Sequence, residues 1–288
     1  MIEKHLEGKV ALITGAGSPK GMGQAIATRL AEAGADIVVS DIEKGDPDPS
    51  HKNFGYEFGA FKGLDAAVSK IEALGRKALA IMADVRKSED VQALVKSVRK
   101  NFGRLDILVN VAGGDWGAAL IKDYDESEFI KTFDINMFGT FRMCKYALPY
   151  IARKKGTIIN MSSMAATRTN LFYSAYAASK AAIISFTESL ALEYGAKGVR
   201  AFALMPGMIQ TEMLDYEARA TAGALNLSED DVKKLYIDNT PLRCLGKPID
   251  VANLVAFLCS DRASFLTGLA ISVSGGLNIA YPISEIKF

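Results

Sequence analysis

The feature that most constrains the fold is a glycine-rich loop between an apolar run and an amphipathic segment near the start of the chain. The run from Lys9 to Thr14, with the apolar residues Val10-Ala11-Leu12-Ile13, predicts a buried strand, and the segment Gln24–Ala33, closed by Gly34, predicts a helix. A loop that merely connects these elements would explain the glycines alone. The order strand, loop, helix instead predicts a phosphate or pyrophosphate site, because glycines admit an anion to the backbone and a helix N-terminus supplies free amides. The glycines concerned are Gly15, Gly17, Gly21 and Gly23.

An acidic residue follows the next predicted strand, Asp36–Ser40. This residue, Asp41, stands eighteen residues after Gly23. An acidic side chain near that distance accepts hydrogen bonds from the adenosine ribose of NAD and repels the additional phosphate of NADP. The alternative is an ordinary solvated aspartate in a loop. We favour the ribose role, so the sequence predicts NAD as the cofactor, with NADP the less favoured alternative.

Apolar runs and helical segments alternate along the rest of the chain. This alternation predicts an α/β fold: one Rossmann-type, doubly wound parallel sheet of about seven strands with helices on both faces, in a single domain over residues 1–288. Residues about 43–62 interrupt the pattern as an insertion loop, and the polar, helix-prone stretch at about 208–245 is expected to form a substrate lid. The other expected strands are Ala78–Met82, Asp106–Val109, a run from Ile158, Val199–Leu204 and Leu269–Val273, and the other expected helices include Ser88–Phe102 (capped by Ser88), Asp125–Arg153, a segment from Tyr173 to about Gly195, and Ile249–Cys259.

A serine, a tyrosine and a lysine come together around the run that starts at Ile158. Ser163 ends this run, Tyr176 follows thirteen residues later, and Lys180 lies one helical turn beyond Tyr176. A neighbouring ammonium group favours a phenolate, so we expect the pKa of Tyr176 to fall below its ordinary value. Tyr176 is therefore the candidate acid/base, with Ser163 as a second hydrogen-bonding group. Tyr150 and Lys154 share the spacing but lack the preceding strand and serine, and we assign them to a helix end.

Composition and charge exclude several classes of function. The net charge is +1 over 288 residues, which gives no indication of a nucleic-acid or membrane partner. No apolar run approaches the roughly 18 residues that a membrane span needs. The start of the chain has no signal-peptide-like stretch, and three scattered cysteines fit a reducing, cytoplasmic location. The histidines, His5 and His51, have no metal-ligand spacing, so no metal site is expected.

The motifs, in this order and over nearly the whole chain, resemble those of the short-chain dehydrogenase/reductase family. The residues that carry the resemblance are the loop Thr14–Gly23, Asp84 with Val85, Asn110–Gly113, Asn136, Ser163, Tyr176 with Lys180, and Pro206-Gly207 followed by Thr211. The resemblance implies that Tyr176 exchanges a proton with the substrate oxygen. It also implies that Lys180 lowers the pKa of Tyr176 and holds the nicotinamide ribose, and that Ser163 hydrogen-bonds the substrate oxygen. Asn136 would hold a water in the proton path, or would simply pin its helix to a neighbouring strand.

The resemblance also implies a cofactor site and a homotetramer. Asp84 and Val85 would meet the adenine, and Ile209 and Thr211 would fix the nicotinamide carboxamide. One tetramer interface would involve the helices bearing Asn136 and Tyr176, and another the C-terminal strand region. The full set of expected cofactor residues is Gly15, Gly17, Gly21, Met22, Gly23, Asp41, Ile42, Asp84, Val85, Asn110, Ala112, Gly113, Tyr176, Lys180, Pro206, Gly207, Ile209 and Thr211.

Departures from the family pattern bear on the cofactor. The glycine loop is two residues longer than usual, with Pro19 and Lys20 added, and a basic residue at the position of Lys20 tends to favour NADP in this family. We give Asp41 precedence, because a carboxylate repels a phosphate directly. The insertion resembles that of carveol-dehydrogenase-like members. Ser274 and Cys244 stand where Asp and Arg are common, away from the expected chemistry.

The expected activity is NAD-dependent interconversion of a secondary alcohol and its ketone. The alternatives are an NADPH-dependent ketone reductase and a non-catalytic NAD-binding regulator or scaffold. A mostly apolar pocket suggests a cyclic, aromatic or otherwise hydrophobic alcohol, although Met213 and Leu214 would serve equally to pack the lid. Asp115 would add a polar contact or be an ordinary loop residue. The expected substrate residues are Ser163, Ala165, Trp116, Tyr173, Tyr176, Met208 and Met213.

Overall fold

The computed structural model describes residues 4–42, 63–169 and 171–279, and its centre is a sheet of seven strands in the order β3-β2-β1-β4-β5-β6-β7. Every neighbouring pair of strands is parallel. The predicted single α/β domain with one parallel sheet is therefore confirmed. The strands are β1 (Val10–Thr14), β2 (Asp36–Asp41), β3 (Ala78–Met82), β4 (Ile107–Asn110), β5 (Thr157–Met161), β6 (Arg200–Pro206) and β7 (Leu269–Val273).

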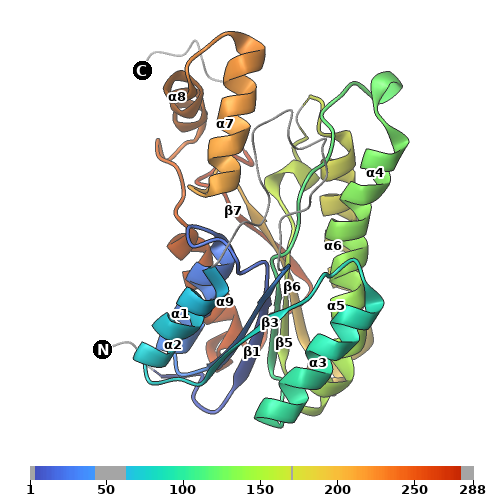
Figure 1. Cartoon of the computed structure of the whole chain (residues 1–288), viewed down its shortest axis with the longest axis vertical. Helices are drawn as coiled ribbons and strands as arrows, with labels where there is room; N and C mark the ends of the chain where they lie inside the picture. Colours follow the sequence, from blue (N-terminus) through green and yellow to red (C-terminus); the bar gives the residue numbers. More distant parts are fainter. Residues whose placement is uncertain (1–3, 43–62, 170, 280–288) are drawn as a thin grey trace.

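Helices cover both faces of the sheet, which explains why the central strands are mostly apolar (Figure 1). All residues of β1, β4 and β5 are buried. Each fully buried Leu or Ile contributes roughly 1.5–3 kcal/mol, so these layers supply much of the stability. One layer consists of α1 (Met22–Glu32), α2 (Gly63–Ala73) and α9 (Pro248–Cys259), and the other of α3 (Ser88–Phe102), α5 (Gly139–Arg153) and α6 (Ser174–Tyr194).

The strand order places a binding crevice at one position. β1 lies between β2 and β4, and the helices that follow these strands lie on opposite faces of the sheet. At such a switch point the loops at the carboxyl ends of the strands separate, and ligands of open α/β sheets bind there. The loops after β1 and β4 carry the predicted glycine-rich and Asn110–Gly113 motifs.

The helix expected over Asp125–Arg153 is continuous but not uniform. It begins as α4 (Glu126–Phe133), passes through one π-helical turn, Asp134–Phe138, and continues as α5. The Asp125 carboxylate caps its start by accepting hydrogen bonds from the amides of Ser127 and Glu128. Asn136, in the π-helical turn, is completely buried. Single π-helical turns within α-helices are frequent at functional sites.

One predicted cap is wrong. Ser88 was expected to cap α3, but Lys87 is the residue before the helix and no side chain caps it. Ser88 is instead the first helical residue. The neighbouring acidic residue Asp90 accepts a hydrogen bond from the backbone amide of Asp84, so it ties α3 to the loop after β3.

Two helices, α7 (Glu212–Leu225) and α8 (Glu229–Asn239), stand beyond the carboxyl end of the sheet (Figure 1). Thr211 caps α7, and Ser228 and Asp231 form a capping box on α8. The helices pack through a small cluster of Ala218, Ala222 and Val232. The lid predicted for about 208–245 stays a prediction, and the insertion predicted at about 43–62 lies outside the described residues. Short helical turns occur at Ile121–Asp123, Met164–Ala166, Gly195–Lys197 and Asp261–Ala263.

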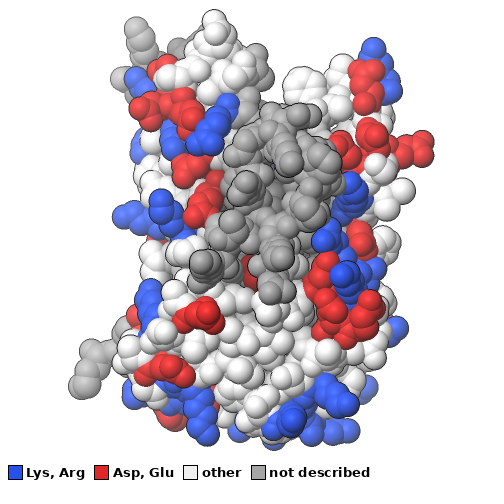
Figure 2. Space-filling view, in the orientation of Figure 1, with Lys and Arg blue, Asp and Glu red and all other residues white. Residues whose placement is uncertain are grey.

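The face drawn in Figure 2 has no large region of a single charge among its described residues. Figure 2 shows acidic and basic side chains interspersed on the flanks of one face, with Lys and Arg gathered along its lower edge. Within the described residues, no helix has both the length and the apolar character needed to cross a membrane. The same part of the chain holds no group of three or more His, Cys, Asp or Glu residues placed to bind a metal ion.

Candidate active site

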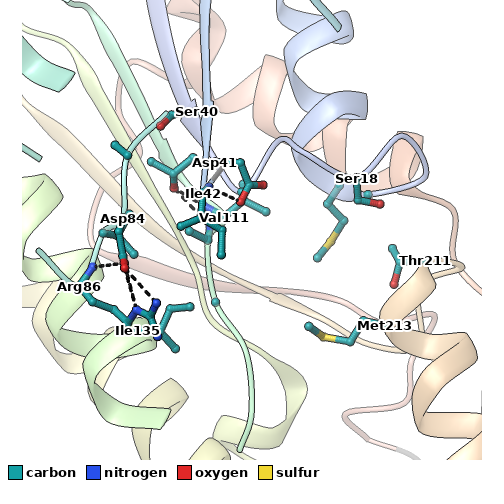
Figure 3. A pocket seen from close by; sticks show the side chains of 18 of the residues that line it. Ser18, Ser40, Asp41, Ile42, Asp84, Arg86, Val111, Ile135, Thr211 and Met213 are labelled. Atoms are coloured by element: carbon teal, nitrogen blue, oxygen red, sulfur yellow. Dashed lines mark hydrogen bonds and ion pairs between the residues drawn. The ribbon is translucent and has the colours of Figure 1, made fainter. Parts of the chain in front are cut away.

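A cavity lies where the loops after β1, β2, β3 and β4 meet the start of α7 (Figure 3). It contains residues from motifs that are far apart in the sequence, as expected at the switch point. The predicted substrate residues Trp116 and Met213 also line it. The predicted cofactor residues in its lining are Gly15, Gly21, Met22, Asp41, Ile42, Asp84, Val85, Ala112, Gly113 and Thr211.

The glycine-rich loop leaves room for an anion at the N-terminus of α1. Gly15 has a φ of +67°, and a Cβ at this position would lie 2.6 Å from the Ala112 amide nitrogen. Gly21 precedes α1 without a side-chain cap, and the first turn of the helix has no acidic residue. The amides and positive dipole end of α1 are therefore available to a ligand, as the pyrophosphate of a dinucleotide requires. The residues present fit such a group.

Asp41 stands at the end of β2 with both carboxylate oxygens engaged by the backbone. Oδ2 accepts a hydrogen bond from the Gly17 amide at 2.6 Å, and Oδ1 accepts one from the Ile42 amide at 2.8 Å. Burial raises the pKa of Asp41, although both of these hydrogen bonds lower it. Each oxygen keeps a second lone pair, so the carboxylate is oriented and still able to accept from ribose hydroxyls. Gly17 itself does not line the cavity, but its amide holds Asp41, which does.

Asp84 is held by Arg86. The Arg86 guanidinium donates to both carboxylate oxygens, from Nε to Oδ1 at 3.0 Å and from Nη2 to Oδ2 at 2.9 Å (Figure 3). Burial raises the pKa of Asp84, but the hydrogen bonds and charge of Arg86 outweigh burial and hold this pKa below its ordinary value. Asp84 is therefore a fixed anion beside Val85 at the edge of the cavity.

At the opposite end, the first turn of α7 meets the glycine-rich loop. The Ser18 hydroxyl donates to Glu212 Oε2 at 2.8 Å, and Thr211 and Met213 line the cavity on either side of Glu212 in the sequence. Thr211 also caps α7, so its hydroxyl is tied to the helix start. The segment that follows β6 thus brings the start of α7 to the glycine-rich loop.

Asn136 joins three elements. Its Nδ2 donates to the Gly114 carbonyl at 2.7 Å and to Ser179 Oγ at 3.1 Å, and its Oδ1 accepts from the Gly114 amide at 3.1 Å. It therefore pins its helix to the loop after β4 and to α6. One lone pair of Oδ1 remains for the predicted water, whose role stays a prediction. A Cβ on Gly113 would lie 2.6 Å from Asn136 Oδ1 and 3.1 Å from Lys180 Nζ, so this loop passes directly over both side chains.

Ser163, Tyr176 and Lys180 lie together. Lys180 Nζ donates to the Met161 carbonyl at 3.0 Å, at the end of β5, and lies 5.4 Å from the centre of the Tyr176 ring. Ser163 follows β5 directly and hydrogen-bonds Tyr176, while its Oγ accepts from the Ala165 amide at 3.1 Å. The phenol and the ammonium group are on one side of α6, as the spacing predicted.

The expected fall in the pKa of Tyr176 is wrong for this arrangement. Burial raises the pKa, and the charges of Glu217 and Asp115 raise it further, although the Ser163 hydrogen bond lowers it. Lys180 does not offset these effects, because burial disfavours its own charged form and lowers its pKa to about 8. Spacing along a helix indicated the neighbouring cation but not the carboxyl groups that other segments bring close.

Of those carboxyl groups, sequence reasoning left Asp115 open between a polar contact and an ordinary loop residue, and it did not assign Glu217. Burial, followed by the charges of Glu217 and Glu128, raises the pKa of Asp115 to about 7. Burial raises the pKa of Glu217 to about 7 as well. A signal for Glu217 was present, because it lies one helical turn after Met213, which was already predicted to face the pocket.

Other predicted residues lie outside the cavity lining. The amide of Asn110 donates to Asn160 Oδ1 at 2.8 Å, within the sheet. Tyr176 and Lys180 stand behind Gly113, which lines the cavity, and Tyr173 precedes α6. Lys20, the basic residue of the lengthened loop, is exposed and is not among the lining residues. The further predicted residues that are not in the lining are Gly17, Gly23, Asn110, Pro206, Gly207, Ile209, Ser163, Ala165, Tyr173 and Met208.

The second pair with the same spacing is a useful contrast. Tyr150 lies near the end of α5, where the Arg99 guanidinium stacks 4.7 Å from the centre of its ring. Lys154 is exposed, immediately after the helix. Neither residue lines the cavity.

Known proteins match this chain over nearly its full length. A family profile described as Enoyl-(Acyl carrier protein) reductase matches residues 15–278. The 7alpha-hydroxysteroid dehydrogenase of Escherichia coli (strain K12) is 34% identical over 276 residues, which cover 94% of this chain and 95% of that protein. A short-chain type dehydrogenase/reductase from Mycobacterium ulcerans superposes with a TM-score of 0.80 at 30% identity, over 96% of this chain and 91% of its own. A structure of NAD+-bound xylitol dehydrogenase superposes with a TM-score of 0.81 at 31% identity, over 94% of this chain and 99% of its own. The chain belongs to the short-chain dehydrogenase/reductase family of oxidoreductases.

Proposed function

We propose that the protein is an NAD-dependent dehydrogenase that interconverts a secondary alcohol and its ketone. The observation that carries this proposal is the cluster of Ser163, Tyr176 and Lys180 behind Gly113, which lines the same cavity as Asp41 and Asp84. Ser163 hydrogen-bonds Tyr176, and Lys180 Nζ lies 5.4 Å from the Tyr176 ring. A protein that only bound a dinucleotide would have no use for a buried phenol beside a buried amine.

Asp41 supports NAD over NADP. Its carboxylate is oriented by the Gly17 and Ile42 amides, at the place where the adenosine ribose of a dinucleotide would lie. A phosphate on that ribose would meet a carboxylate, and the exposed Lys20 does not line the cavity. One of the similar structures, the xylitol dehydrogenase, was solved with NAD+ bound.

The residues of this chain would bind and move the proton. A bound NAD would supply the acceptor for the hydride of the carbinol carbon, and during oxidation of the alcohol the hydroxyl proton would pass to the Tyr176 phenolate. Ser163 would hydrogen-bond the same oxygen and hold it at the phenol. Lys180 would hold the nicotinamide ribose and pass the proton onward, with Asn136 keeping the loop after β4 in place. In the reverse direction Tyr176 would donate the proton.

The substrate pocket combines apolar surface with the catalytic hydroxyl groups. Trp116 and Met213 line the cavity, and Tyr173 adjoins Tyr176 at the start of α6. Ala165 and Met208 lie on the segments after β5 and β6. These side chains favour a cyclic or aromatic alcohol, because flat apolar groups bury well against aromatic rings and methionine.

A homotetramer is part of the proposal. Apolar side chains remain exposed on the segments that the family resemblance assigns to subunit contacts, namely Phe138 and Phe141 beside α5, Leu192 on α6, and Phe265 and Leu269 near β7. Large exposed apolar side chains on neighbouring helices are typical of association surfaces. Sedimentation of the purified chain tests this assignment, and we further propose that the protein works in the cytoplasm.

The decisive test is Tyr176→Phe. General acid–base catalysis contributes about 10²- to 10⁴-fold, so we expect kcat to fall by at least that range while NADH fluorescence titration shows nearly unchanged binding. Tyr150→Phe is the matched control, because Tyr150 has the same spacing to a lysine and should leave kcat unchanged. Retention of most of the rate by the Tyr176→Phe variant would end the assignment.

A further inference from the structure

The carboxyl groups of Asp115 and Glu217 lie at the catalytic end of the site, and the chemistry proposed above does not use them. Asp115 belongs to the loop after β4, between Gly113 and Trp116, which both line the cavity. Glu217 lies on α7, one helical turn after the cavity-lining Met213 and therefore on the same face of the helix. The charge of each carboxyl group acts on Tyr176.

These groups have fewer partners than buried carboxylates normally have, and the hydrogen bond that Asp115 accepts from a described residue comes from the Trp116 amide. Asp115 Oδ1 is buried and accepts no hydrogen bond from any described residue. Glu217 forms neither a hydrogen bond nor an ion pair within the described part of the chain, and burial alone accounts for its shifted pKa. The described cation whose charge acts on Asp115 is Lys180, which already donates to the Met161 carbonyl. A buried carboxylate is costly unless it is paired, so the acceptors here are available to a ligand.

Tyrosines surround the same position. The charges of Asp115 and Glu217 both act on Tyr173 and Tyr216, and the charge of Glu217 also acts on Tyr236 of α8. Tyr124 and Glu128 are also close enough to interact electrostatically with Asp115. The Tyr124 hydroxyl donates a hydrogen bond to the Trp116 carbonyl at 2.6 Å. Aromatic rings and carboxylates together form the usual environment of a bound ammonium group.

We propose that Asp115 and Glu217 are specificity-determining residues that select an alcohol substrate carrying a protonated amine, such as an aromatic amino alcohol. The proposal rests on the dehydrogenase function above and names its substrate class. An ammonium group supplies three donors and a positive charge, so it satisfies both carboxylates at once. A neutral hydroxyl supplies one donor and leaves the repulsion between the carboxylates in place.

The same contact would assist the proton transfer. The negative charges of Asp115 and Glu217 oppose formation of a phenolate at Tyr176, because like charges repel. A bound ammonium group offsets both charges and so lowers the pKa of Tyr176 while the substrate is in place. A substrate with an ammonium group therefore lowers the pKa of Tyr176, its own acid/base group, and a neutral analogue does not.

The test compares secondary alcohols that share a phenyl ring and differ in one terminal group. The substrates are 2-amino-1-phenylethanol, 1-phenyl-1,2-ethanediol and 1-phenyl-1-propanol, assayed with NAD near neutral pH. Hydrogen bonds to charged groups contribute about 1.5–3 kcal/mol, so kcat/KM should favour the amino alcohol over 1-phenyl-1-propanol by about ten- to a hundredfold. Preference for the diol or for 1-phenyl-1-propanol overturns the proposal.

Variants assign the preference to the carboxyl groups. Asp115→Asn and Glu217→Gln should each remove most of it. Glu229→Gln is the matched control, because Glu229 pairs with Arg219 on the exposed side of α8, and it should retain the full preference. The pH profile for 1-phenyl-1-propanol should also move to lower pH in Glu217→Gln, which a purely structural role would not produce. Persistence of the preference in the double variant contradicts the assignment.

A binding measurement separates this proposal from the proposed function. 2-Phenylethylamine has no carbinol and cannot be oxidised, so calorimetric titration with NADH present reports the ammonium site without turnover. Binding to the wild type and to Tyr176→Phe, with loss in the Asp115→Asn/Glu217→Gln double variant, supports the specificity site even if Tyr176→Phe retains activity. Absence of binding to the wild type overturns the specificity site and leaves the dehydrogenase assignment to its own test.

Discussion

The carboxylates at the adenosine end of the site and those at its catalytic end differ in how far they are paired. At the adenosine end, Asp41 accepts from two backbone amides and Asp84 is bound by Arg86. At the catalytic end, Asp115 accepts a hydrogen bond from the Trp116 amide but has no cation bound to it among the described residues, Glu217 has neither kind of partner there, and the pKa of each is raised to about 7. Carboxylates that are already paired, such as Asp41 and Asp84, have a fixed orientation, which suits one constant ligand. Carboxylates without a bound cation, such as Asp115 and Glu217, keep oxygen atoms free to accept from a ligand and raise the pKa of the neighbouring Tyr176.

The largest expected effect is a loss of catalytic rate caused by a substitution at the catalytic end. Lys180→Met should reduce kcat by about 10²- to 10³-fold, because the proton relay and the contact to the ribose are lost. The thermal unfolding midpoint should stay the same or rise, since a buried amine with a pKa lowered to about 8 is replaced by an apolar side chain. Lys154→Met, in the second Tyr/Lys pair, is the control and should change neither quantity. A midpoint that falls by many degrees would mean that Lys180 mainly holds β5 and α6 together.

A smaller effect is expected at the adenosine end. Asp41→Asn removes the negative charge but keeps the shape, so NADP should gain relative to NAD by about ten- to a hundredfold in kcat/KM. Asp36→Asn, at the start of the same strand, should leave the ratio unchanged. If the wild type already prefers NADP, the NADPH-dependent reductase becomes the better assignment and Asp41 has no role at the ribose.

The smallest effect concerns stability and pH. A carboxyl group whose pKa is raised on folding stabilises the protein below its unfolded pKa, and this contribution is lost as pH rises through about 7. Glu217→Gln keeps the neutral form at every pH. Its unfolding midpoint should therefore match the wild type near pH 5 and exceed it by a few degrees near pH 8. Equal midpoints at both pH values would show that Glu217 is ionised without penalty, and the contrast between the two ends would disappear.

Much of the fold follows from local patterns in the sequence. The run at Ala78–Met82 became a strand with the predicted bounds, and the run at Lys9–Thr14 became a strand that begins one residue later, at Val10. The buried strand β1 is apolar except at Thr14, because helices cover both faces of the sheet. The order of strand, glycine loop and helix placed Gly15 and Gly21 in the lining of the cavity beside the start of α1. The cap predicted at Ser88 was wrong, since a cap depends on the geometry of one turn that residue type alone does not determine.

The catalytic end shows where sequence reasoning stops. The spacing of Tyr176 and Lys180 correctly placed them on one side of a helix, because helical periodicity is a local property. The direction of the Tyr176 pKa shift was decided first by burial, to which the charges of Glu217 on α7 and Asp115 in the loop after β4 add. The sequence by itself determined the order of the elements and the candidate catalytic side chains. Only the tertiary structure decided their electrostatics, because burial and charge act through space between segments that are distant along the chain.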